Sequence, residues 1–330
     1  MTTSNLIKRV LPLVLSIAAI GTAQAAVPSF DLGAASNYSA YIYGNVSKVT
    51  DIEGRLAVGG DFTASGTSIG YRAPYGSTGP SLVVGGNVAL SGGDIYAPPK
   101  SKVDTTVGYG PITSYTKALN GKGVYGGTNT SSKYHNLTHK DISKVTDFAA
   151  TKTSLTALSN TLNKQASNGT SVKFVDGGIS LIGNGKSGVE VFNLDTNNLT
   201  NLTLSNVAKD AIVLINVTGT GTVTFGGGQD GQLEALRNNV LFNLNGATGV
   251  QISTFTWGSI LANNADLTGT GHLEGSIVAK SISSAVEVGW EPFKGYVAQP
   301  VPEPETYAMM LAGLALVGGI ARRRRQQQAR

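Results

Sequence analysis

The stretch Arg55-Leu56-Ala57-Val58-Gly59-Gly60-Asp61-Phe62 is echoed 26 residues later by Ser81-Leu82-Val83-Val84-Gly85-Gly86-Asn87-Val88. Each copy consists of an apolar run, a Gly-Gly turn that ends in Asp or Asn, and the start of a second apolar run. A weaker copy follows at residues 123–128. Repetition of one strand–turn–strand unit indicates stacked units, each of which satisfies the backbone groups of the next.

A second pair of echoes lies near the end of the chain, where Gly-Ser-Ile-Leu-Ala at 258–262 returns as Gly-Ser-Ile-Val-Ala at 275–279. Between the two pairs, short apolar runs bounded by turn residues predict strands at 172–175, 179–182, 189–194, 199–204, 211–217, 223–225, 240–244 and 250–255. Asn193, Asn216 and Asn243 stand near the ends of these runs and suit the corners between coils. We expect a mainly β domain built as a β-solenoid. A β-sandwich with unequal strand spacing is the alternative.

One segment departs from the β pattern and predicts a helix. Between Thr146 and Asn168, apolar residues recur at helical intervals with alanines among them: Phe148, Ala149, Ala150, Leu155, Ala157, Leu158 and Leu162. Thr146 or Asp147 can cap the start, and Asn168-Gly169 marks the stop. We expect one amphipathic helix over about 147–166, packed along the side of the β body.

The composition fits an exported β domain without covalent cross-links. The 330 residues contain no cysteine, which excludes disulfides, thiolate zinc sites and cysteine nucleophiles together. The 43 glycines and the low charged fraction of 14% are typical of many short strands and tight turns. The length is sufficient for one domain with a sizeable core.

The N-terminus has the three parts of a secretory signal peptide. Lys8 and Arg9 form a basic region, an apolar run follows over 10–20, and Ala23-Gln24-Ala25 is a small-x-small cleavage site. Residues 1–25 are therefore predicted to direct the chain to the Sec translocon. Signal peptidase is expected to remove them by cleavage between Ala25 and Ala26. The mature β domain is expected to span 26–295.

The C-terminus has a proline-rich linker over 296–305, an uncharged stretch over 306–321 and a basic tail over 322–330. At 16 residues the uncharged stretch is short for a membrane-spanning helix, but flanking arginines can snorkel and lengthen its reach. Because a basic cluster next to an apolar span stays on the cytoplasmic side, the rest of the chain is expected outside the cell membrane. An ordinary membrane anchor that is never cut is the simpler alternative.

This tail resembles the PEP-CTERM sorting signal of Gram-negative bacteria. The match consists of Pro302, Glu303 and Pro304, an apolar segment rich in small residues, and an arginine run formed by Arg322, Arg323, Arg324 and Arg325. The resemblance implies recognition by exosortase, a membrane protease-transferase. It also implies release or re-anchoring at the cell surface and an association with exopolysaccharide and biofilm.

The body resembles the choice-of-anchor A domain of bacterial surface proteins. The matching pieces are residues 32–35, 53–61, 257–262, 275–279 and 292–295. The resemblance covers nearly the whole mature chain and implies an extracellular β-rich domain. The layout of β coils with one flanking helix is also loosely similar to the ice-binding β-solenoid.

The net charge of +5 comes from the two ends of the chain. Without the two basic residues of 1–25 and the five arginines of 322–330, residues 26–321 carry 18 basic and 20 acidic residues, a net charge of −2. The body therefore gives no reason to expect nucleic acid as a partner.

Histidines and a glycine-rich turn are weak candidates for chemistry. His135 and His139 are four residues apart but lie in a segment that reads as a solvated loop, and His272 has no partner nearby in sequence. Residues 183–188 (Gly-Asn-Gly-Lys-Ser-Gly) satisfy a dinucleotide-binding pattern, yet a strand follows where a phosphate-binding helix should start. We expect a corner between coils there, and neither a metal site nor a cofactor.

Carboxylates and aromatic residues keep two other functions open. A glycoside hydrolase needs two carboxylates close in space, and seven are available: Asp51, Glu53, Asp61, Glu190, Asp195, Glu234 and Glu287. Trp257, Trp290 and Phe293 flank the last echo pair, where they either close the end of the β body or stack on sugars.

These observations favour a non-enzymatic cell-surface or matrix protein without catalytic residues, which presents a β surface to polysaccharide, a neighbouring cell or itself. A polysaccharide-degrading enzyme on a β-helix and an ice-binding or adhesin protein are the alternatives.

Overall fold

The computed structural model describes residues 30–73, 77–98, 103–107, 110–114, 120–132, 135–295, 312–313 and 327–328. Pro28–Val297 forms one compact unit. The predicted signal peptide and the linker at 296–305 lie outside the described residues, as do Pro302, Glu303, Pro304 and Arg322–Arg325. All of the predicted anchor except 312–313 lies outside them too. Within the described ranges, no helix combines the length and apolarity that a membrane crossing requires.

The described residues of the compact unit form mainly short strands, with one α-helix and three 3-10 helices. The helices are η1 (Gly33–Asn37), η2 (Ile142–Lys144), α1 (Phe148–Leu162) and η3 (Arg237–Asn239). The strands are β1 (Ala40–Ile42), β2 (Val46–Lys48), β3 (Asp51–Ile52), β4 (Leu56–Val58), β5 (Phe62–Ser65), β6 (Ser68–Ile69), β7 (Leu82–Val84), β8 (Val88–Ser91), β9 (Val103–Val107), β10 (Gly110–Ser114), β11 (Gly123–Tyr125), β12 (Leu137–His139), β13 (Thr170–Lys173), β14 (Ile179–Ile182), β15 (Val189–Leu194), β16 (Asn198–Ser205), β17 (Ile212–Val217), β18 (Gly221–Gly231), β19 (Val240–Asn243), β20 (Ala247–Ile252), β21 (Phe255–Trp257), β22 (Ser259–Gly269), β23 (His272–Glu274), β24 (Ile277–Ser283) and β25 (Glu287–Val288). The prediction of a mainly β protein with one helix is confirmed.

The strands pair in three series, which we call ladders A, B and C. Ladder A runs β12-β11-β7-β4-β1-β24-β22-β19-β17-β15, ladder B runs β8-β5-β2-β24-β22-β20-β18-β16-β14-β13, and ladder C runs β6-β3-β25-β23-β21. The long strands β22 and β24 contribute to both A and B. Apart from the hairpins β9–β10 and β13–β14, the described strand pairs are parallel. The segment predicted as a strand at 172–175 therefore belongs partly to an antiparallel hairpin.

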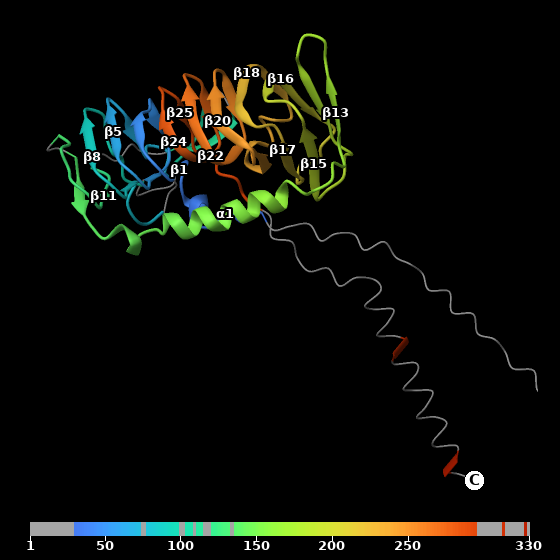
Figure 1. Ribbon diagram of the computed structural model, residues 1–330, viewed down its shortest axis with the longest axis horizontal. Coiled ribbons are helices and arrows are strands. Elements are labelled where there is room, and N and C mark those ends of the chain that lie inside the picture. The colour runs from blue at the N-terminus through green and yellow to red at the C-terminus, as the bar shows by residue number, and fades with distance from the viewer. Residues whose placement is uncertain are drawn as a thin grey trace, which may run out of the picture. The chain divides into compact units, whose positions relative to one another are not determined.

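The order of the strands in space differs from their order in sequence. Strand β1 lies between β4 and β24. The two strands of ladder A that come first and last in the sequence, β1 and β24, are therefore neighbours in the middle of that ladder. From β1 the chain runs outward to β12, and α1 then carries it along the sheet toward β15 (Figure 1). From there the strands return to β24. The prediction that Trp257, Trp290 and Phe293 close an end of the β body is wrong, because the last strands pair on both sides.

The sequence echoes stack in register. Leu56, Ala57 and Val58 pair with Leu82, Val83 and Val84, and residues 260–262 pair with 277–279. The Gly-Gly turns are required because neighbouring turns touch: a Cβ on Gly85 would lie 2.2 Å from the carbonyl oxygen of Gly59. The residue after each Gly-Gly pair connects the turns, since Asp61 Oδ1 accepts the amide of Asn87 at 2.7 Å. Asn87 Oδ1 accepts the amide of Thr128 in turn, at 2.9 Å.

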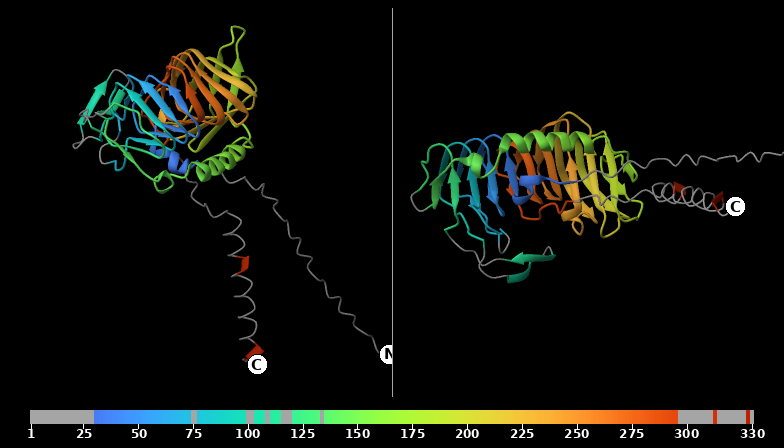
Figure 2. Two further views of the ribbon diagram at one scale, coloured as in Figure 1. Left: turned by 60° about the vertical axis from the view of Figure 1, so that its left-hand side comes forward. Right: turned by 90° about the horizontal axis from the view of Figure 1, so that it is seen from below.

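Helix α1 begins where the sequence predicts and ends earlier. Asp147 caps it by accepting the amide of Ala150 at 2.9 Å. The helix ends at Leu162, not near 166, because Ser167 and Asn168 bond to the edge of β15 instead. The helix lies along the outer side of ladder A (Figure 2). It buries Leu155, Ser159 and Leu162.

An asparagine row joins α1 to ladder A. Asn193, Asn216 and Asn243 are consecutive partners on β15, β17 and β19. Asn243 donates its side-chain amide to Asn216 Oδ1, and Asn216 donates its own to Asn193 Oδ1, both at 2.9 Å. Asn216 also donates to the carbonyl of Leu162 at 2.9 Å, and Asn243 donates to that of Ser159 at 3.0 Å. The expectation that these asparagines form corners is wrong. Because they donate to carbonyls at the end of α1, which also accept the backbone amides of Asn163 and Gln165, they fix the helix on the sheet.

Candidate functional site

The outer surface of ladder B has no helix over it within the described part of the chain, in contrast to ladder A (Figure 2). Its strands alternate between buried apolar and more exposed polar residues, as in Phe62, Thr63, Ala64 and Ser65 of β5. Buried side chains such as Leu267, Val250 and Val223 point to the core in one row. Alternation with period two leaves the intervening residues on the outer face.

Small polar residues on this outer face also form rows. Thr268, Gln251, Thr224 and Asn198 are consecutive partners on β22, β20, β18 and β16. On the other half of ladder B, Ser91 and Ser65 are partners, with their hydroxyl oxygens 3.2 Å apart. Within a row, neighbouring residues lie at the strand spacing of about 4.8 Å. We call this surface the ladder B face.

Ladder C carries a cluster of charges on its outer side. Its members, which we call the charge cluster, are Glu53, Tyr71, Arg72, Arg237, His272, Glu274, Glu287 and Glu291. Arg72 is 6% exposed and contacts both Glu53 and Glu274, the latter at 2.7 Å. Arg237 and Arg72 lie 3.2 Å and 3.6 Å from Oε1 of Glu291. Three cations thus face four carboxylates.

His272 lies at the edge of the charge cluster. Its protonated ring donates from Nε2 to Glu274 at 2.9 Å and from Nδ1 to Glu287 at 3.3 Å, and it stacks on Phe255 at 4.4 Å. Burial lowers the pKa of His272, but the hydrogen bonds to Glu274 and Glu287 outweigh that effect and raise the pKa from 6.5 to about 9. The same His272 contact lowers the pKa of Glu287. His272 has no partner nearby in sequence, but the fold brings two carboxylates to its ring.

The pKa of Glu53 is shifted upward, in the opposite direction to that of Glu287. Burial raises the pKa of Glu53, although Arg72 lowers it. Tyr71 donates to Glu53 at 2.9 Å and to Glu287 at 3.3 Å, which brings together two of the carboxylates considered for glycoside hydrolysis. Ligand atoms of Glu53, His272 and Glu287 lie within 4.8 Å of one another. Arg72 and the His272 proton already neutralise these carboxylates, so the donor set fits an internal ion-pair network better than a metal.

The free energy of unfolding is expected to depend on pH through His272. Because its pKa is raised above the unfolded value of 6.5 to about 9, its stabilisation is complete below pH 6.5. It is lost as the pH rises through 9, by about 3 kcal/mol in total. Denaturant titrations between pH 6 and 10 measure this, with His272→Gln expected to flatten the profile. His139→Gln is the control, since the exposed His139 hydrogen-bonds only the Gly126 carbonyl among the described contacts. An equally steep profile for His272→Gln would contradict the assignment.

The other carboxylates considered for catalysis do not join the cluster. Asp51 accepts the amide of Ser68, Asp61 connects two turns, and the fully buried Glu190 accepts the amide of Asn184. Asp195 and Glu234 are exposed. Sequence reasoning therefore identified two members of the charge cluster, Glu53 and Glu287. It did not identify Arg72, Glu274 and Glu291, because these residues reach the cluster from three separate segments.

The remaining candidates are placed as follows. His139 lies in β12 and not in a loop, while His135 precedes that strand. Residues 183–188 connect β14 to β15, and no helix begins there, as expected. Trp257 is buried, with the Arg237 guanidinium 5.9 Å from its ring centre, and Phe293 packs against Phe30. Trp290 lies against Gly54, where a Cβ would meet its ring.

The domain thus combines parallel strand ladders, a broad polar face and a largely buried cluster in which three cations face four carboxylates. The chain is a member of the ice-binding-like adhesive domain family, whose model matches residues 31–290. The PEP-CTERM protein-sorting motif matches residues 300–325, which confirms the resemblance found in the tail and implies an exported protein processed by exosortase. No curated protein matches the chain.

Several solved structures are similar. An ice-binding protein from the Antarctic ascomycete Antarctomyces psychrotrophicus is 14% identical, with a TM-score of 0.33, over 83% of this chain and 100% of that one. A glycosylated ice-binding protein from an Arctic yeast is 12% identical, with a TM-score of 0.33, over 83% and 97%. An ice-binding protein domain from Shewanella frigidimarina is 10% identical, with a TM-score of 0.27, over 80% and 100%.

Proposed function

We propose that this protein is a non-catalytic adhesive protein of the cell surface, which holds exopolysaccharide of the biofilm matrix on its ladder B face. The observation that carries the proposal is the in-register row of Thr268, Gln251, Thr224 and Asn198 on that face. A repeating polar surface suits an extended, repetitive ligand. The buried, paired state of Glu53 and Glu274 supports a role without catalysis, since a glycosidase pair must flank an accessible bond.

Export and sorting complete the proposal. The chain passes through the Sec translocon, loses residues 1–25 to signal peptidase and is held transiently in the inner membrane by 306–321, with the basic tail in the cytoplasm. Exosortase then cuts near Pro302-Glu303-Pro304. The family match to the sorting motif supports this sequence of events.

The architecture that we propose for the adhesive domain is a β-solenoid, in which ladders A, B and C are the three faces of successive coils. Parallel pairing between echoed segments supports it. We also propose that the domain is of the choice-of-anchor A type, on the residues that carry that resemblance.

The test uses the protein purified from its native cell surface and exopolysaccharide extracted from the same cells. We expect the protein to bind immobilised polysaccharide and to release no soluble glycan on prolonged incubation. A Thr224→Glu/Gln251→Glu variant should bind less, because two new carboxylates would interrupt the row. A Thr153→Glu/Thr161→Glu variant of α1, which adds the same two charges, is the matched control. Release of glycan would favour the enzyme alternative. Thermal hysteresis without polysaccharide binding would favour ice binding.

A further inference from the structure

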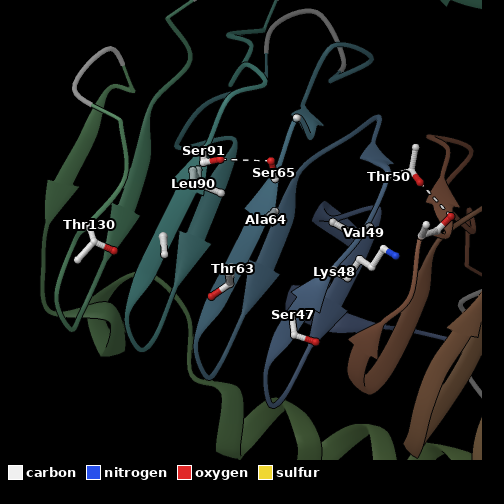
Figure 3. A pocket seen from close by; sticks show the side chains of 13 residues that line it. Ser47, Lys48, Val49, Thr50, Thr63, Ala64, Ser65, Leu90, Ser91 and Thr130 are labelled. Carbon is white, nitrogen blue, oxygen red and sulfur yellow. Dashed lines mark hydrogen bonds between the residues drawn. The ribbon is translucent and has the colours of Figure 1, made fainter.

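A groove of about 600 Å³ opens on the N-terminal half of the ladder B face (Figure 3). It crosses β8, β5 and β2, with Thr130 at one end and Ala285 at the other. These are five neighbouring segments of chain, so at the strand spacing the groove extends about 19 Å across the strands. A ligand in it would therefore run perpendicular to the strands.

The groove has an apolar floor and a hydroxyl rim. Ala89 on β8, the half-buried partner of Thr63 on β5, gives the floor an apolar side chain on the outer face, while Val49, Ala64 and Leu90 belong to the core beneath it. Hydroxyls line the rim on every crossed strand, as Figure 3 shows for Ser91 on β8, Ser65 on β5 and Ser47 on β2. A sugar ring has apolar C–H faces and polar edges, which match this alternation. The small size of Ala89 leaves the space that a larger side chain would fill.

Lys48 gives the groove its charge. It is the one charged residue among the 13 that line the groove, and none of them carries a carboxylate. Within the described part of the chain Lys48 is exposed and has no ion-pair partner, whereas Lys280 on the neighbouring β24 pairs with Asp266 at 3.2 Å. An uncompensated ammonium beside a hydroxyl rim is complementary to a carboxylate on a sugar.

We infer that this groove binds an anionic polysaccharide, with Lys48 pairing with the sugar carboxylate and the hydroxyls of Ser65 and Ser91 bonding the sugar edges. This inference rests on the proposed function and specifies its ligand class and its site. The spacing supports it, because successive strands offer hydroxyls at a repeat close to the length of one sugar unit.

The test measures binding of the full-length protein to polygalacturonate and to its fully methyl-esterified form, which has the same backbone without the charge. We expect binding to polygalacturonate that weakens with salt, and much weaker binding to the ester. Lys48→Gln should lower affinity for polygalacturonate about tenfold, whereas Lys48→Arg should retain it. Lys186→Gln, an exposed lysine in the turn before β15, is the matched control.

A second variant tests the shape of the groove. Ala89→Leu should fill the floor and weaken binding of both polymers, with circular dichroism confirming that the fold is retained. Equal binding of the two polymers, or full affinity in Lys48→Gln, would overturn the inference. If the native exopolysaccharide still binds in that case, the proposed function stands and this groove is not its site. If neither polygalacturonate nor the native polysaccharide binds, both proposals fall together.

Discussion

Replacement of Arg72 by methionine is expected to lower the free energy of unfolding by about 3–5 kcal/mol. Arg72 is buried and lies between Glu53 and Glu274, with Glu291 at 3.6 Å. Methionine preserves most of the packing volume but leaves these carboxylates facing one another with less compensation. Removing one member of a buried ion pair costs more than the pair contributes, because the remaining charge is desolvated. For a domain of this size the melting temperature should fall by about 10 °C.

Two measurements separate this effect from a general loss of packing. Arg55→Met is the matched control, because Arg55 donates to the carbonyl of Pro80 at 2.9 Å and pairs with no carboxylate in the described residues. It should cost about 1 kcal/mol. The defect of Arg72→Met should also shrink at acidic pH, since burial already raises the pKa of Glu53 and protonation removes the repulsion. Equal losses in the two variants would show that the cluster charges do not matter to stability.

Deletion of residues 302–325 is expected to abolish surface retention and to release unprocessed protein into the medium. The deleted segment contains the Pro-Glu-Pro motif, the apolar stretch and the four arginines that match the sorting motif. Without the apolar stretch and its basic flank, nothing in the tail stops translocation or presents the cleavage site. Intact mass and terminal peptide mapping of the surface and medium fractions measure the outcome.

A smaller deletion provides the control. Removal of residues 326–330, which lie beyond the matched motif, should leave display and processing unchanged. The wild-type surface form should begin at Ala26 and end near residues 302–305. Surface protein that still carries residues 322–330 would show that the tail is a plain membrane anchor. Unchanged display after the larger deletion would contradict sorting altogether.

Local sequence patterns were sufficient for the elements of the fold. The echoed Gly-Gly turns stack in register because each copy has the same length and the same close backbone approach at Gly59 and Gly85. Asp147 caps α1 because a side-chain oxygen at that position needs only its own helix. The sorting motif is likewise a contiguous stretch that can be recognised without a fold.

The residues of the candidate sites could not be predicted from local sequence patterns. The charge cluster joins Glu53, Arg72 and Glu274, and the last of these is 202 residues from Arg72 in sequence. Its side chains meet because β3 and β23 both pair with β25. The groove beside Lys48 arises from strands that are neighbours only once β2, β5 and β8 have stacked.

The sequence by itself determined the β character, the single capped helix, the echoed turns and the sorting tail, because each depends on residues within one local stretch. The tertiary structure alone decided that the first and last strands meet in the middle of ladder A. It also decided that Asn193, Asn216 and Asn243 hold the helix and that four distant carboxylates share three cations. These features depend on which strands pair across long separations, and a periodic pattern specifies the face of a strand without specifying its neighbour.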